Sequence, residues 1–274
     1  MAPGPDLDQE LFIWATRQMA RFPGGPRDRH PPRKPGWENF PTAGDQTRPL
    51  PFSDGEVHFL YWFIQGSIMN PETRCRLRRA WGFCQRHALA HLAVEFAFRN
   101  GWVHGCAVLY DDIMDRARLA FGGPIRPRLW LALRLRQTAP CLMCELGFGP
   151  DSAATAPADI LSRGREAAGL QAFGLITEPY WRPAVCAHCL GQTATPQSPR
   201  CRPHLVADIL ARRPVDLPAQ KELVASVCRA VSCYSRSFRL EFQGTDTVED
   251  RAGLIAAVGW CSGWSEWLRL VGVR

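Results

Sequence analysis

The sequence predicts an all-α protein, a helical bundle-like domain with zinc-knuckle turns and two related Cys-x2-His half-modules. Three observations lead to this prediction. Apolar residues recur at helical spacing along most of the chain, and the alternating pattern of a half-buried strand is almost absent. Capping residues, prolines and short cysteine or histidine couples separate the periodic segments.

Composition places the chain among soluble globular proteins. Its 274 residues, 46% of them hydrophobic, can bury a sizeable core, which argues against a disordered chain. No apolar stretch reaches the ~18 residues that a membrane-spanning helix needs. Residues 1–10 lack the basic and then apolar order of a secretory signal. We therefore expect a cytoplasmic protein with no membrane partner.

The net charge of +7 is carried almost wholly by arginine. A basic chain is compatible with an anionic ligand such as nucleic acid. The arginines, however, are spread along the sequence, and the run Arg74 to Arg79 is interrupted by Cys75 and Leu77. We interpret this run as a solvated helix face, and a protein partner stays open beside an anionic one.

Residues 1–52 are predicted to form an N-terminal helix and a proline-rich arm. Apolar residues at helical spacing indicate a helix over about 7–21. The stretch 23–51 is rich in glycine and proline and is typical of an extended linker.

Residues 53–138 are predicted to form a first helical half-module. Ser53 or Asp54 can cap its first helix, and Asn70 followed by Pro71 marks the start of the second. Asn100 and the glycine after it end the third. The predicted helices cover about 53–69, 70–80, 84–99, 103–119 and 127–137.

Residues 139–274 are predicted to form a second, cysteine-rich helical half-module with the C-terminal helices. Pro179 and Pro183 are expected to frame a bend that leads into Cys186. The predicted helices cover about 158–173, 201–212, 217–238 and 247–270.

Four cysteine and histidine couples are the strongest chemical signal. With 11 Cys and 7 His, chance gives roughly 0.7 such couples. Two intervening residues let neighbouring side chains in a turn converge on one ion, as in structural zinc sites. The couples are Cys84-x2-His87, Cys141-x2-Cys144, Cys186-x2-Cys189 and Cys201-x2-His204.

Cys186, Cys189, Cys201 and His204 make the more compact candidate site. They supply three thiolates and one imidazole, the donor set of a closed tetrahedral zinc site. The loop between the two couples is short, so closing it costs little entropy. Cys201 also opens a predicted helix, whose N-terminal partial charge favours thiolate.

Cys84, His87, Cys141 and Cys144 form another Cys3His set. Residues 88–140 separate its two couples, so only the fold can bring them together. Spacing alone also permits exchanged pairs, such as Cys141 and Cys144 with the Cys201 couple. The donor types favour two Zn2+ ions over iron–sulfur clusters, which usually take four thiolates.

An internal echo links the half-modules. Cys84-x2-His87 and Cys201-x2-His204 both stand on the first turn of an apolar predicted helix. Two related units are therefore expected.

Other side chains suggest further chemistry. His91 and Glu95 follow His87 on one helix face, as an extended metal or acid–base site or, as we favour, as packing residues. Asp111 to Asp115 reads DDxxD, a pattern that presents carboxylates to magnesium in prenyl diphosphate enzymes. The remaining cysteines are interpreted as core residues: Cys75, Cys106, Cys228, Cys233 and Cys261.

Several of these pieces together resemble an uncharacterised bacterial family of helical proteins with paired CPxC and GFCxxH motifs. The matching segments are Gly82-Phe83-Cys84-Gln-Arg-His87, Leu109-Tyr110-Asp111-Asp112, Cys141-Leu-Met-Cys144, Cys201-Arg-Pro-His204 and Ser235-Arg-Ser-Phe238-Arg239, within about 55–270. The family usually has a CxxC before its first GFCxxH. Here no cysteine precedes Cys75, and Cys186-x2-Cys189 is the couple that can replace it. The resemblance implies a helical fold and metal binding, and no activity.

The sequence thus predicts a cytoplasmic zinc protein whose ions join helices, acting as a protein-interaction or regulatory module. The alternative is an enzyme, either a thiol-redox enzyme using a CxxC pair or a magnesium-dependent one using the DDxxD helix.

Overall fold

A computed structural model describes residues 48–122 and 128–273 of the chain. Within these residues every regular element is a helix, as the sequence predicts. The predicted helix over 7–21 and most of the arm over 23–51 lie outside the described residues.

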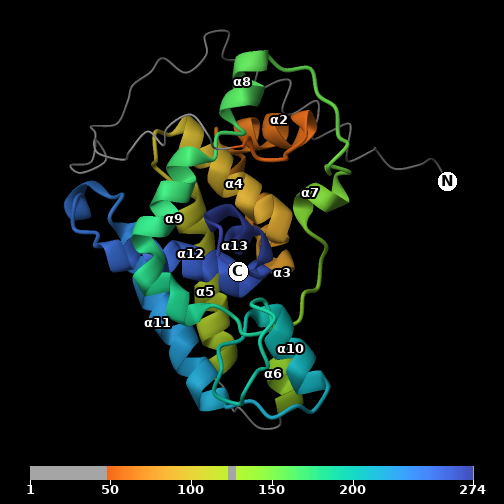
Figure 1. The fold of residues 1–274 in the computed structure, drawn as a ribbon, viewed down its shortest axis with the longest axis vertical. Helices are drawn as coiled ribbons and strands as arrows, with labels where there is room; N and C mark the ends of the chain where they lie inside the picture. The colour runs from red at the N-terminus through yellow and green to blue at the C-terminus, as the bar shows by residue number, and fades with distance from the viewer. Residues whose placement is uncertain (1–47, 123–127, 274) are drawn as a thin grey trace, which may run out of the picture. The chain divides into compact units, whose positions relative to one another are not determined.

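The helices follow one another along the chain, with longer connections over residues 146–157 and 185–201 (Figure 1). They are α2 (Asp54–Phe63), α3 (Pro71–Ala80), α4 (Gln85–Phe98), α5 (His104–Gly122), α6 (Arg128–Leu135), α7 (Leu142–Glu145), α8 (Ala158–Arg163), α9 (Ala168–Trp181), α10 (Arg202–Leu210), α11 (Leu217–Arg236), α12 (Val248–Ser262) and α13 (Ser265–Val271). Three 3-10 turns accompany them, η2 (Ser67–Met69), η3 (Arg182–Ala184) and η4 (Leu240–Phe242).

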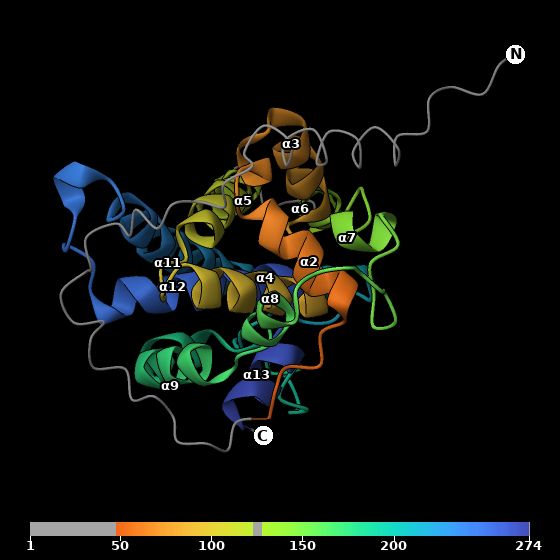
Figure 2. The ribbon, with the colours of Figure 1, turned by 90° about the horizontal axis from the view of Figure 1, so that it is seen from above.

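The core lies where α5, α9, α11 and α12 pack together. Helix α11 contacts both α5 and α12, and α9 packs on α12. Figure 2 shows α9 alongside α12 and α4. Large rings fill the space between these helices, since Trp181, Trp260 and Trp264 are all fully buried. Because α5 packs on α11 and α12, the predicted half-modules 53–138 and 139–274 share this core. The boundary between them stays a prediction.

Side-chain caps fix several helix starts. The hydroxyl of Ser53 accepts from the Glu56 backbone N–H, and the Glu56 carboxylate accepts from the Ser53 backbone N–H. Such a capping box satisfies two backbone donors that a helix start would otherwise leave open. Asn70 caps α3 ahead of Pro71, as predicted. The box also places Glu56, a fully buried acid, beside His87 of the candidate metal site formed with Cys84, Cys141 and Cys144.

Three predicted helices are shorter or more broken than expected. The helix predicted over 53–69 ends at Phe63, and the chain continues as a turn and η2. The one predicted over 247–270 is divided by Gly263, whose φ of +105° only glycine adopts readily. A Cβ at Gly263 would lie 2.4 Å from Gln85 Nε2. The positive φ and the close approach of α4 both favour glycine at this break.

The helix predicted over 158–173 is also wrong, because two helices replace it. Helix α8 ends before Gly164, where a Cβ would lie 2.4 Å from Val57 Cγ1 of α2. The turn places Arg165 so that its guanidinium donates to Phe52 O. Pro179 does not frame a bend as predicted, since α9 runs through it to Trp181. Pro183 lies in η3, after which the chain becomes extended at Val185 and reaches Cys186, so only the second of the two prolines marks the bend.

Candidate metal centres

The first set of donors joins α4 to the short helix α7. Cys84 is the N-cap residue of α4, and Cys141 is the N-cap residue of α7. Neither thiol caps the backbone, so both are free for an ion. His87 and Cys144 stand on the first turns that follow. Residues 88–140 separate the two couples, and the fold brings them together, with α7 packed on α3.

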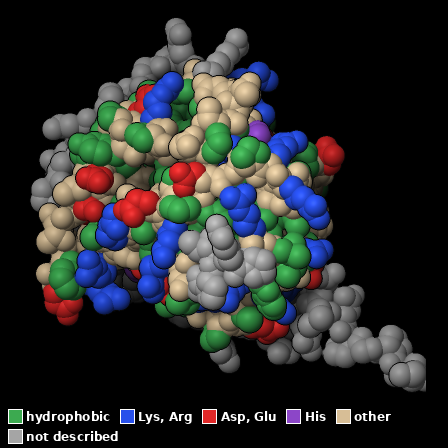
Figure 3. Space-filling view, turned by 90° about the horizontal axis from the view of Figure 1, so that it is seen from below, with side chains coloured by type: hydrophobic (Ala, Val, Ile, Leu, Met, Phe, Trp, Pro, Cys, Tyr) green, Lys and Arg blue, Asp and Glu red, His purple; other side chains and the backbone are tan. Residues whose placement is uncertain are grey.

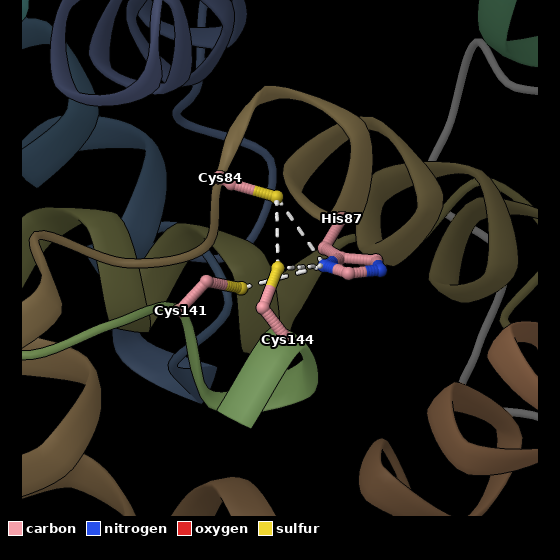
Figure 4. A group of neighbouring side chains, drawn as sticks. All are labelled: Cys84, His87, Cys141 and Cys144. Atoms are coloured by element: carbon pink, nitrogen blue, oxygen red, sulfur yellow. Dashed lines mark hydrogen bonds between the residues drawn. The ribbon is translucent and has the colours of Figure 1, made fainter. Parts of the chain in front are cut away.

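Distances in this set match a tetrahedral ion (Figure 4). Each of the three sulfurs lies 3.3–3.4 Å from His87 Nδ1, and Cys84 Sγ lies 3.8 Å from Cys144 Sγ. Zinc bond lengths of ~2.3 Å to sulfur and ~2.05 Å to nitrogen give tetrahedral edges of about 3.8 Å for S–S and about 3.5 Å for S–N. The four donors therefore fit one Zn2+ without rearrangement.

Glu56 orients the histidine of this set. His87 Nε2 lies 3.0 Å from Glu56 Oε1, which leaves Nδ1 directed at the three sulfurs. Arg86 donates to both oxygens of the same carboxylate. Burial would raise the pKa of Glu56, but hydrogen bonds from His87 and Arg86 outweigh it and hold that pKa well below its usual range. Glu56 is thus a charged outer partner of the site.

The thiols and imidazole of the first set are poised for ligation. Hydrogen bonding from the Cys84 thiol lowers the pKa of Cys141 to about 3, although burial opposes it. Burial lowers the pKa of His87, but hydrogen bonds with Cys141 and Glu56 outweigh it and raise that pKa to about 9. A proton shared among these donors is what a bound cation would replace.

The second set is built from a turn and the start of α10. Cys186 and Cys189 lie in the turn after η3, where Ala187 N donates to Pro199 O at 3.1 Å. Cys201 is the N-cap residue of α10, and His204 stands on its first turn. The three sulfurs lie 3.1–3.5 Å from His204 Nδ1, and Cys189 and Cys201 are 3.8 Å apart. These values again fit one tetrahedral Zn2+.

A buried ion-pair network lies next to the second set. Asp208 lies one turn beyond His204 and accepts from Arg200 Nε at 2.7 Å. His188 Nε2 lies 2.9 Å from the same carboxylate, and its ring packs 5.0 Å from that of His204. Burial raises the pKa of Asp208, but hydrogen bonds from Arg200 and His188 outweigh it and lower that pKa. The network fixes residues 190–200, called the knuckle loop below, against α10.

The structure therefore joins the four couples in the pairing that spacing favoured, and not in the exchanged one. All four donors of each set lie within 4.8 Å of one another. In both sets a Cys-x2-His couple begins a helix and a Cys-x2-Cys couple closes over it, so the predicted echo of half-modules is present in the site geometry.

The structure also contains a third group, His91, Glu95 and Cys106, of which the sequence predicts only the first two as neighbours. His91 and Glu95 follow His87 along α4, but they group with Cys106 of α5 and not with the first set. Glu95 accepts from the backbone N–H groups of Gly105 and Cys106 at 2.6 and 2.7 Å. It therefore caps α5, which is a structural task. No spacing signal in the sequence links Cys106 to α4.

The DDxxD carboxylates diverge and are occupied by protein partners. Asp112 pairs with Arg78 of α3, Asp115 lies 2.7 Å from Arg118, and Asp111 accepts from a serine of α11. They do not form a shared cation cradle.

The cysteines outside the sets are divided by burial. Cys106, Cys228 and Cys261 are buried, as predicted for core residues. Cys75 is exposed and Cys233 is half-buried, so the core prediction is wrong for Cys75 and only partly right for Cys233. Both stand on outward faces of amphipathic helices that the periodicity could not orient.

Comparison of the chain with protein-family models, with curated proteins and with solved structures finds no match.

Proposed function

We propose that this chain is a cytoplasmic zinc protein in which two structural Zn2+ ions clasp the helices, and that it acts as a protein-interaction or regulatory module. The observation that carries the proposal is the convergence of two Cys3His sets at tetrahedral spacing. Four protein donors fill the coordination of each ion, which is typical of structural rather than catalytic zinc.

The position of each set supports a clasping role. One ion would tie α7 and its flanking loops to the start of α4, and the other would close the knuckle loop onto α10. Helix α7 covers only four residues and cannot bury much apolar surface by itself. Ligation would therefore supply folding free energy where packing is thin.

An interaction role is supported by the outer face of α6. Leu129, Trp130 and Leu133 are 49–58% exposed there, and arginines 134 and 136 flank them. Figure 3 views the end of the molecule that carries α6, where hydrophobic and basic side chains lie side by side. Exposed aromatic and aliphatic groups beside arginine are typical of protein interfaces, and the charge favours an acidic partner. Nucleic acid is the weaker alternative.

The use of the cysteines supports a reducing compartment. Six of the eleven lie in the two metal-ligand sets. Cytosolic proteins keep such thiols reduced and use them for metal. In the part of the chain that the structure describes, no helix has the length and apolarity to cross a bilayer.

An enzyme remains the second candidate, with less support. The CxxC thiols that would serve redox chemistry belong to the metal sets, and the DDxxD carboxylates have protein partners. The resemblance to the bacterial family with CPxC and GFCxxH motifs stays a proposal.

Metal analysis of the purified chain tests the proposal. We expect about two zinc ions per chain and a colourless protein. Cys201→Ser should lose one ion and destabilise α10, whereas Cys75→Ser, outside both sets, should keep both. A brown, iron-containing protein would indicate an iron–sulfur cluster in place of zinc. A metal-free protein that is fully folded would favour a redox role for these thiols over metal binding.

A further inference from the structure

The two metal centres differ in how far solvent reaches their sulfurs. In the first, Cys144 is exposed and Cys84 is half-buried. In the second, Cys186 and Cys201 are completely buried, and only Cys189 is half-buried. Oxidation of a thiolate depends on its accessibility to the oxidant. The same donor set is therefore unequally protected.

Assuming the proposed zinc ligation, we infer that Cys144 is a site of oxidative modification by hydroperoxides, and that its reaction with Cys84 releases the zinc ion of the first centre alone. The Cys144 thiolate attacks the peroxide O–O bond and becomes a sulfenic acid, with hydroxide leaving. The Cys84 thiolate then attacks the Cys144 sulfur and expels a second hydroxide. Two thiolates, one H2O2 and two protons thus give one disulfide and two waters.

Geometry selects Cys84 as the partner. Its sulfur lies 3.8 Å from Cys144 Sγ, so the two must approach by about 1.8 Å to reach a disulfide length of ~2.05 Å. Cys141, the N-cap residue of α7, is only 5% exposed. Only His87 and Cys141 would remain as ligands, and two donors do not retain a structural ion.

Loss of this ion would remove one of several contacts that hold α7 and its loop. The loop that carries α7 is also held by Ser53 Oγ, which donates to Gly149 O at 2.7 Å, and by Gly55 N, which donates to Ser152 O at 2.9 Å. Arg76 pairs with Glu145 on the same loop. Release at the first centre is therefore local and can be reversed by reductant and zinc.

Loss at the second centre would be different in kind. The knuckle loop covers Arg200 and Asp208, which are 1% and 2% exposed. Opening it would expose a buried ion pair and the start of α10. Oxidation should therefore release the zinc ion of the first centre, while the ion of the second centre stays bound.

The experiment uses the full, zinc-loaded chain. Hydrogen peroxide is added, zinc release is followed with a chromogenic chelator, and thiols and disulfides are mapped by alkylation and mass spectrometry. We expect one of the two ions to leave in a fast phase, together with a Cys84–Cys144 disulfide. Cys186, Cys189 and Cys201 should still be reduced, and dithiothreitol with zinc should restore the ion.

Cys75→Ser is the matched control, because Cys75 is exposed but belongs to neither set. The fast phase should persist in it. Release of both ions at one rate, earlier oxidation of the second set, or a disulfide that omits Cys144 would overturn the inference. Total zinc measured after denaturation separates this failure from that of the proposed function, which would give no zinc at all. Because mapping is done on the unaltered chain, no variant has to fold for the test to decide.

Discussion

Glu56→Gln tests whether the first centre depends on its charged outer partner. The carboxylate is fully buried and holds His87 Nε2 at 3.0 Å, Arg86 and the backbone N–H of Ser53. Glutamine keeps the shape but removes the charge, and its amide nitrogen cannot accept from Ser53. Loss of such an outer partner typically weakens metal binding by about 10–100-fold, or about 1.4–2.7 kcal/mol.

The assay is stepwise competition for zinc with a chelator of known affinity, which resolves the two ions. We expect the affinity of one ion to fall by about 10–100-fold in Glu56→Gln and that of the other to stay unchanged. Glu145→Gln is the control, because Glu145 neighbours Cys144 but pairs with Arg76 at the surface, where ion pairs contribute about 0–1 kcal/mol. Unchanged affinity in Glu56→Gln, or an equal loss at both sites, would refute the reasoning.

Three further substitutions test the packing around the sites. Burial lowers the pKa of His91 from 6.5 to about 3, so between these values the unfolded chain binds more protons and stability falls with falling pH by up to about 1.4 kcal/mol per unit. His91→Leu should remove that slope in urea unfolding from about pH 7 to about pH 4. Asp208→Ala leaves the buried Arg200 guanidinium without its carboxylate and should cost about 3–5 kcal/mol in the same assay; a loss below 1 kcal/mol would mean that the pair is dispensable. Gly263→Ala forces a side chain into a positive φ and against Gln85, and should lower the unfolding free energy by about 1–3 kcal/mol, only partly recovered by Gln85→Ala.

The sequence was informative where chemistry is local. Asn70 and Pro71 begin α3 as expected, because a cap and a first-turn proline act within four residues. The two Cys-x2-His couples likewise mark the starts of α4 and α10, where their cysteines are the N-cap residues. Donor types and spacing then sufficed to favour the observed grouping of eight donors.

What the sequence missed depends on contacts between distant segments. Gln85 of α4 packs against the break at Gly263, and the periodicity of residues 247–270 contains no information about α4. Glu56 is an ordinary capping-box residue in sequence, and its role beside His87 arises only when α2 packs on α4. The same holds for Cys106, which joins Glu95 through the packing of α5.

The unequal loops of the two centres predict the order in which they load. Residues 88–140, 53 in number, separate the couples of the first set, and residues 190–200, 11 in number, those of the second. Closure entropy that grows as 1.5RT ln n favours the shorter loop by about 1.4 kcal/mol, or about tenfold in affinity from an unfolded chain.

Packing adds to this difference rather than opposing it. The second centre needs only a turn and the start of α10, whereas the first needs the starts of α4 and α7, which are distant in sequence, already brought together. Refolding with one equivalent of zinc should therefore protect Cys186 and Cys201 from alkylation while Cys84 still reacts. Protection of Cys84 first would mean that the helices assemble before any metal binds, and that the ions stabilise a fold which forms without them.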